Sequence, residues 1–141
     1  MVKSNAQKLQ KKAESAKVSE LPVHSFMTRD VITLVKGTKI YSAVKSLSIN
    51  RISGAPVVDA SGRLVGLVTE YDLLMQVATR DVAEPFTYNE KVLTVLPDQT
   101  LGEVLVTLYK TKYRRLPVVN ELKQVVGIVS RIDVLKKLVN L

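Results

Sequence analysis

The sequence contains no cysteine and only one histidine, His24. The lack of cysteine excludes disulfides, thiolate chemistry and cysteine-ligated zinc, and it fits a reducing cytosol. His24 has no partner at a spacing typical of a histidine metal site or a Ser-His-acid site. Neither a Walker-type phosphate loop nor a G-x-G-x-x-G fingerprint is present. We therefore expect a cytoplasmic protein that is not an enzyme, binds no metal and requires no cofactor.

Long apolar runs are missing as well. No run approaches the roughly 18–20 residues of a membrane span, and the lysine-rich N-terminus lacks the apolar region of a secretory signal. The chain has 141 residues, of which 46% are hydrophobic and 24% charged, as in ordinary globular proteins. The sequence thus predicts a compact globular module with no membrane partner.

The net charge is +8, and residues 1–20 contribute +3 of it. Such a balance is compatible with nucleic acid, an anionic membrane or a phosphorylated small molecule. No basic stripe interleaved with aromatic residues and no nucleic-acid motif is present, so we do not expect nucleic acid as a partner. Residues 3–19 predict a polar helix or frayed tail, with a solvated extension favoured over a docked first helix.

An internal duplication dominates the rest of the chain. Residues 92–135 align without a gap on residues 31–74, at an offset of 61, and eleven of the 44 pairs are identical. A unit of about 60 residues buries little surface alone, so two units should share one core with pseudo-twofold symmetry. Any site should then occur twice, or once in a degraded form.

Each copy predicts the order strand, helix, two hairpin strands and helix, which gives an α/β (α+β) fold class. In the first copy we expect the first strand at 31–35, a helix from Thr38, the hairpin strands at 55–59 and 64–68, and the second helix from Thr69. In the second copy we expect the first strand at 92–96, a helix near 100–111, the hairpin strands at 116–120 and 125–129, and the second helix from Arg131. Residues 80–91 connect the two copies. The predicted organisation is an extension at 1–20, a first repeat at 21–80 and a second at 81–141.

Several local features of the hairpins carry expectations. The apolar strands show no polar alternation, which predicts burial on both faces. Gly62 should supply the positive φ of the first turn. Gly66 and Gly127 should allow close packing of each hairpin against a helix. Pro56 and Pro117 should begin their strands.

Two segments carry a family resemblance. Residues 53–74 read SGAPVVDASGRLVGLVTEYDLL, and residues 115–135 repeat this pattern as RLPVVNELKQVVGIVSRIDVL, while FMT precedes the first copy at 26–28. These segments resemble the signature of the CBS domain, and the resemblance covers residues 22–140. It implies a tandem pair in one disc-shaped Bateman module, which commonly dimerises and binds adenosine-containing ligands in two clefts between the repeats. The second copy departs by having residues 121–124 without glycine at its turn and Tyr88-Asn89 in place of Met27-Thr28.

The resemblance also implies which residues form the clefts. The first cleft would use Met27, Ile32, Ile52, Ser53 and Gly54 with Ile128, Ser130, Ile132 and Asp133. The second would use Tyr88, Leu93, Tyr113, Arg114 and Arg115 with Leu67, Thr69, Tyr71 and Asp72.

The chemistry of these residues suits a nucleotide. An ionised Asp72 or Asp133 can accept from a ribose diol, and helices capped by Thr69 and Ser130 would leave free N–H groups for phosphate. Arginines 114 and 115 could bind phosphates in the second cleft. In the alternative interpretation, S/T-x-x-D is only a helix cap and the arginines are only solvated.

The expected function is a ligand sensor that binds AMP, ADP, ATP or S-adenosylmethionine and regulates a separate partner protein. Two alternatives stay open, namely a structural dimerisation or adaptor module with degenerate clefts and nucleic-acid binding through the basic face. We expect a homodimer built on apolar helix faces. The candidate residues are Ile40, Ala43, Val44, Leu47, Leu74, Met75, Leu101, Val104, Leu105, Leu108, Leu135 and Leu138.

Overall fold

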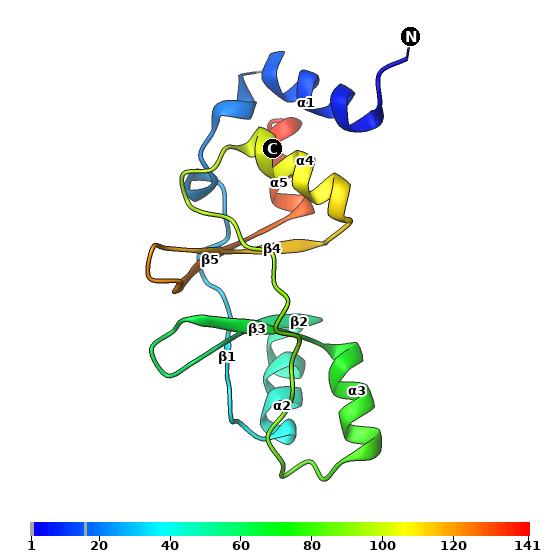
Figure 1. The fold of residues 1–141 in the computed structure, drawn as a ribbon, viewed down its shortest axis with the longest axis vertical. Coiled ribbons are helices and arrows are strands. Elements are labelled where there is room, and N and C mark those ends of the chain that lie inside the picture. Colours follow the sequence, from blue (N-terminus) through cyan, green and yellow to red (C-terminus); the bar gives the residue numbers. More distant parts are fainter. Residues whose placement is uncertain (1, 16) are drawn as a thin grey trace. The chain divides into compact units, whose positions relative to one another are not determined.

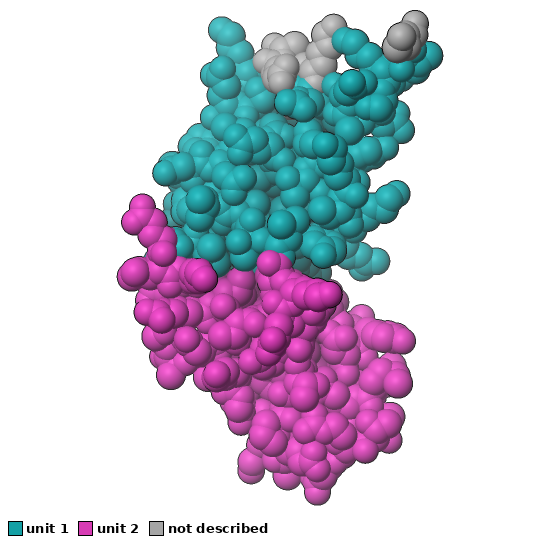
Figure 2. Space-filling model, viewed as in Figure 1, with its two compact units in different colours: residues 1–31, 93–120, 126–141 teal, residues 32–92, 121–125 magenta. Residues whose placement is uncertain are grey.

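The computed structural model describes residues 2–15 and 17–141, except for the side chains of residues 11–15. Its contacts divide the chain into two compact units (Figure 2). Unit 1 consists of residues 1–31, 93–120 and 126–141, and unit 2 of residues 32–92 and 121–125. Each unit thus combines elements from distant parts of the sequence.

Unit 2 contains a three-stranded sheet with two helices on one side (Figure 1). Strand β1 (Leu34–Val35) runs parallel to β2 (Gly54–Val58), which pairs antiparallel with β3 (Leu64–Thr69). Helices α2 (Ile40–Asn50) and α3 (Glu70–Thr79) pack against each other. The core residues are Leu34, Ile40, Ala43, Leu47, Ala55, Val57, Val68, Leu73 and Phe86.

Unit 1 has the same helix–hairpin–helix arrangement with an added N-terminal segment. This segment comprises α1 (Asn5–Ser15) and the 3-10 turns η1 (Val18–Glu20) and η2 (Val23–Ser25). Helices α4 (Leu101–Thr111) and α5 (Arg131–Leu138) lie on one side of strands β4 (Arg115–Val119) and β5 (Val125–Ser130) (Figure 1). The core residues are Val23, Phe26, Val95, Leu101, Val104, Leu108, Leu116, Val118, Val129 and Val134.

The α+β class and the order of elements are confirmed, but the first strand of each copy is shorter than predicted. The strand predicted at 31–35 is reduced to β1, because Leu34 is buried whereas Ile32 is 38% exposed. The strand predicted at 92–96 is reduced to one parallel bridge between Val95 and Val118. Thr100 caps α4, with its side chain accepting from Glu103 N. Thr38 does not cap α2, because its hydroxyl donates to the Val35 carbonyl at 2.6 Å.

The hairpins correct two further expectations. All five residues of β2 are buried, whereas β3 and β5 alternate between half-buried and buried positions. Burial on both faces is therefore wrong for β3 and β5, since β3 lies at the edge of its sheet and β5 pairs with β4 alone. Pro56 and Pro117 lie inside β2 and β4 and are fully buried, not at the strand starts.

The turn between β2 and β3 is held by one carboxylate. Asp59 accepts hydrogen bonds from Ser61 N at 2.9 Å, Ser61 Oγ at 2.7 Å and Arg63 N at 3.0 Å. The Ser61 hydroxyl bond, followed by the Arg63 amide, holds the pKa of the Asp59 carboxyl below its ordinary value. Gly62 has φ 84°, so the predicted positive φ is confirmed. In the second hairpin the non-glycine residue Lys123 adopts φ 64°.

The N-terminal segment and the connector are both part of the packed fold. Helix α1 contacts α4, so the docked helix is the correct alternative and the solvated extension is wrong. Helix α1 docks because its large apolar residue, Leu9, becomes partly buried. The connector carries Phe86, which is 3% exposed in the core of unit 2. In the described part of the chain, no helix combines the length and apolarity needed to cross a membrane.

Candidate ligand-binding residues

Asp133 lies in the first turn of α5 and forms a capping box with Ser130. Its Oδ2 accepts from Ser130 N at 2.8 Å and from Ser130 Oγ at 2.9 Å, while Asp133 N donates back to that hydroxyl at 3.3 Å. Its Oδ1 accepts from Thr28 Oγ1 at 3.3 Å. The carboxylate thus joins the cap of α5 to the segment around Thr28, which precedes β1 in the sequence.

Asp72 repeats this arrangement in unit 2 with one difference. Its Oδ2 accepts from Thr69 N and Thr69 Oγ1, both at 2.9 Å, in the capping box of α3. The residue at the position of Thr28 is Asn89, whose side-chain oxygen instead accepts from Lys91 N at 3.0 Å. Among the described residues, no donor contacts Asp72 Oδ1, so this oxygen remains open to an incoming hydroxyl.

The helix starts offer fewer free N–H groups than the sequence predicts. Glu70 N donates to the Ser53 carbonyl at 2.8 Å, and Arg131 N donates to the Arg114 carbonyl at 3.1 Å. The capping boxes occupy the amides of the cap residue and of the third helical residue. Within the described chain, this leaves only the amide of Tyr71 in α3 and that of Ile132 in α5 without an acceptor. A phosphate could use one amide at each helix start, not several.

The segments around Thr28 and Asn89 each pair with the hairpin of their own unit. Thr28 exchanges two backbone hydrogen bonds with Ile128, at 2.8 and 2.9 Å. Asn89 does the same with Leu67, with both bonds at 2.9 Å. These pairs fix the segments that carry Met27 and Tyr88 against β5 and β3.

Two glycines make this approach possible. A Cβ on Gly127 would clash with the Met27 side chain, and a Cβ on Gly66 would clash with the Tyr88 ring and lie 2.5 Å from the Asn89 carbonyl. The predicted close packing of both glycines is therefore correct, but the contacting element is the preceding segment and not a helix. The reason is that, within each unit, both helices lie on the side of the hairpin away from this segment (Figure 1).

The structure thus groups the predicted site residues by unit. Unit 1 brings Met27 together with Ile128, Ser130 and Asp133, and unit 2 brings Tyr88 together with Leu67, Thr69 and Asp72. Unit 1 also contains Leu93, Tyr113, Arg114, Arg115 and Ile132, and unit 2 contains Ile32, Ile52, Ser53, Gly54 and Tyr71.

Two contacts cut across the predicted grouping. Strand register places Gly54 opposite Thr69, although the prediction assigns them to different clefts. Arg131 similarly binds the Arg114 carbonyl in unit 1, next to Ser130. The assignment of residues to two clefts remains a prediction.

Exposure separates these residues into two groups. Gly54 is buried, and the half-buried residues are Met27, Ile52, Ser53, Leu67, Tyr88, Arg115, Ile128, Ser130, Asp72 and Asp133. The exposed ones are Ile32, Thr69, Tyr71, Leu93, Tyr113, Arg114 and Ile132. The half-buried group combines apolar surface with acceptor oxygens, which suits a nucleoside more than a bare anion.

Two positioning residues were missed by the sequence interpretation. Gln76 of α3 is 8% exposed and holds the backbone of Thr87, accepting from its N–H at 2.8 Å and donating to its carbonyl at 2.9 Å. Arg131 donates from Nε to the Tyr113 carbonyl at 3.0 Å. A glutamine inside an apolar helix face was the only sequence signal for the first, and none existed for the second.

Comparison with known proteins decides the family. The profile of the CBS domain matches residues 18–79 and 80–140. The chain belongs to the CBS domain family. The predicted tandem CBS pair is confirmed by the two matched copies.

Solved CBS pairs share this fold. CBSX2 of Arabidopsis thaliana in complex with AMP is similar with a TM-score of 0.71 and 29% identity, over 84% of this chain and 96% of that one. The CBS domain pair of protein MJ0100, in complex with 5′-methylthioadenosine and S-adenosyl-L-methionine, gives 0.68 and 30%, over 82% and 94%.

The curated relatives that the chain matches are longer than this chain. The Methanocaldococcus jannaschii protein MJ1225 is 32% identical over 83% of this chain and 42% of its own length. The gamma-3 subunit of 5′-AMP-activated protein kinase of Sus scrofa is 29% identical over 86% of this chain and 26% of its own length. The chain therefore spans less than half the length of these relatives.

Proposed function

We propose that this CBS pair is a non-enzymatic sensor that binds an adenosine-containing ligand and regulates a separate protein. The observation that carries the proposal is the duplicated capping box, which puts an acceptor carboxylate beside half-buried apolar side chains in each unit. A ribose diol donates two hydroxyls, and a carboxylate is a pure acceptor for them. The AMP complex of CBSX2 and the S-adenosyl-L-methionine complex of MJ0100 support this ligand class.

The residues at equivalent positions of the two predicted sites differ in charge. Arg114 is exposed, and its side chain makes no hydrogen bond or ion pair with the described residues, so its guanidinium is available for a phosphate. Ser53, the residue aligned with Arg114 by the 61-residue offset, is neutral. We therefore propose that the site using Arg114 and Arg115 prefers AMP, ADP or ATP, whereas the other accepts less charged adenosine compounds.

The test is a thermal-shift and calorimetry panel of adenosine, AMP, ADP, ATP and S-adenosylmethionine. A bound ligand raises stability by RT ln(1 + [L]/Kd), about 2.7 kcal/mol at one hundred times Kd. The double variant Arg114→Ala/Arg115→Ala should lose more affinity for ATP than for adenosine, and the difference should shrink in high salt. No shift with any ligand would refute the sensor and favour an adaptor.

The adaptor alternative, and the homodimer, rest on exposed apolar residues. Most of the apolar residues of α2 and α4 that were predicted to form the dimer interface are buried inside the two units. They are Ile40, Ala43, Leu47, Leu101, Val104 and Leu108. Leu74 and Met75 of α3 and Leu135 of α5 remain 64%, 52% and 52% exposed. We propose a homodimer through α3, and light scattering that finds only monomer at micromolar concentration would refute it.

The basic face is concentrated in one unit. Lysine and arginine exceed aspartate and glutamate by seven residues in unit 1 and by one in unit 2. A nucleic-acid partner would bind with a steep loss of affinity as salt rises. We propose a cytoplasmic location with a small-molecule ligand, and a salt titration with duplex and single-stranded DNA tests the alternative.

A further inference from the structure

We propose that unit 1 contains a second kind of ligand site, a pocket between α1, α4 and α5 that binds an aliphatic carboxylate. The pocket has a volume of about 430 Å³, within the roughly 300–1,000 Å³ of small-molecule sites. None of its lining residues is assigned to the adenosine sites, and the hydrogen bonds of Arg131 to those sites go to the backbone carbonyls of Tyr113 and Arg114. The proposal is therefore independent of the proposed sensor function.

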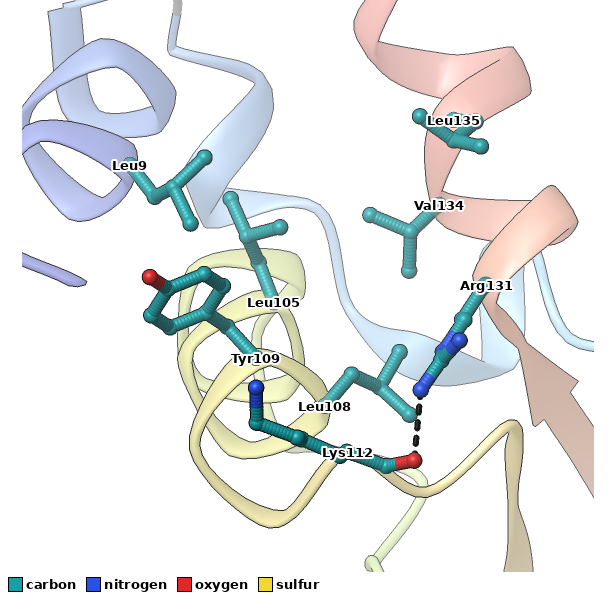
Figure 3. A pocket seen from close by; sticks show the side chains of 8 residues that line it. All are labelled: Leu9, Leu105, Leu108, Tyr109, Lys112, Arg131, Val134 and Leu135. Carbon is teal, nitrogen blue, oxygen red and sulfur yellow. Dashed lines mark hydrogen bonds between the residues drawn. The ribbon is translucent and has the colours of Figure 1, made fainter. Parts of the chain in front are cut away.

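The walls of the pocket are aliphatic. Figure 3 shows Leu9 of α1 and Leu105 of α4 facing Val134 and Leu135 of α5, with Leu108 between the two sides. Leu108 and Val134 are buried, whereas Leu135 is 52% exposed at the rim. An alkyl chain in this space would remove apolar surface of both partners from water, at roughly 25 cal/mol per Å².

Two cations lie at one end of the pocket. Lys112 follows α4 as its C-terminal cap, and Arg131 is the first residue of α5. Arg131 donates from Nε to the Tyr113 carbonyl and from one Nη to the Lys112 carbonyl, which holds the guanidinium at the rim (Figure 3). Its other Nη and the Lys112 ammonium make no hydrogen bond with the described residues.

Neither cation has an acidic partner among the described residues. The ion pair Arg80–Glu84 lies in unit 2 and involves neither Lys112 nor Arg131. None of the described residues that line the pocket is acidic. An apolar cavity with two unpaired cations at one end is complementary to a ligand with an apolar tail and a carboxylate head.

Charge also favours this occupant over a second copy of the chain. Unit 1 has an excess of seven positive residues. A twofold contact through this face would bring Lys112 and Arg131 of both copies close together, and like charges repel. A carboxylate ligand instead neutralises them.

The experiment titrates the full chain with octanoate, decanoate and dodecanoate below their micelle concentrations, using calorimetry. Each two added methylenes should raise affinity roughly tenfold while the chain fits the pocket. Decanol and decylamine, with the same tail and no negative charge, should bind more weakly than decanoate. Amide chemical shifts should change for residues lining the pocket.

Charge variants identify the head-group contact. Lys112→Gln should weaken decanoate about three- to fivefold, as expected for a partly exposed ion pair, and leave decanol unchanged. Lys112→Arg should restore the affinity. Lys110→Gln removes the same charge from α4 outside the pocket lining and serves as the matched control.

Three results would overturn the proposal. The first is no binding across the carboxylate series. The second is equal affinity for decanoate, decanol and decylamine, or equal effects of Lys112→Gln and Lys110→Gln. The third is a dimer that Leu135→Asp converts to monomer without any decanoate binding by the wild type, which would assign the face to a second copy.

Discussion

Replacing the capping-box aspartates separates the structural role of these residues from ligand binding. Asp133→Ala removes the acceptor for the amide and hydroxyl of Ser130 and for the hydroxyl of Thr28. Loss of a cap costs about 0.5–2 kcal/mol, and an unpaired, partly buried amide adds up to a similar amount. We expect a loss of about 2 kcal/mol in unfolding free energy, or roughly 6–8 °C in Tm for a chain of this size.

Asp133→Asn keeps an acceptor oxygen for the Ser130 amide, so its stability should fall by less than about 1 kcal/mol. The amide group cannot accept a hydrogen bond at its nitrogen, so the contact to a ribose hydroxyl is lost. A hydrogen bond to a charged group contributes about 1.5–3 kcal/mol, so affinity for AMP should fall roughly ten- to a hundredfold.

The assay is thermal melting without ligand and calorimetry with AMP, for the alanine and asparagine variants at positions 72 and 133. Thr28→Val is the matched control, because it removes the hydroxyl that donates to Asp133 Oδ1. This oxygen then has no protein donor, like Asp72 Oδ1 among the described residues. Its stability should change by no more than about 0.5 kcal/mol, since Thr28 is exposed. Wild-type AMP affinity in the double asparagine variant would refute the ribose role and leave both aspartates as helix caps.

Three further changes test the packing described above. Gly66→Ala should cost about 2–3 kcal/mol in urea denaturation, because the new methyl group meets the Tyr88 ring and a fixed carbonyl; a neutral result would contradict that close packing. Asp59 has a lowered pKa in the fold, so its stabilising effect is complete above its ordinary pKa and is lost as pH falls through the lower folded value. Asp59→Asn should therefore flatten the acid limb of the stability curve, and an unchanged limb would remove Asp59 as its source. Leu9→Ala should raise hydrogen exchange in α1 with little change in Tm, whereas global destabilisation would show that α1 belongs to the cooperative core.

The sequence predicted those features whose signals are local. The capping boxes at Thr69 and Ser130 are four-residue patterns, and the hairpin around Gly62 has a turn residue with a known conformational need. The predicted aspartates are the residues that the structure places at the helix starts. The duplication located both copies because it aligns without gaps.

The features that were missed depend on distant partners. Asn89 pairs with Leu67 through the backbone, which leaves no trace in side-chain periodicity. Phe86 stands in a segment with the composition of a connector, although it enters the core of unit 2. Leu9 is one leucine in a polar helix, and its partners on α4 and α5 lie about a hundred residues away. The open oxygen of Asp72 likewise depends on which residue the preceding segment brings beside it.

The interleaving of the two units determines how the chain can be divided. A fragment ending at residue 79 would lack Phe86 and Tyr88 and would carry residues 18–31 without their partners in unit 1. A fragment starting at residue 80 would lack Val23 and Phe26 from its core. During synthesis, unit 2 has most of its residues once residue 92 has emerged, whereas the first 31 residues must wait for the C-terminal helix. The two copies of the sequence repeat therefore do not coincide with the two compact units, and expressing either copy alone should give an unstable, protease-sensitive product.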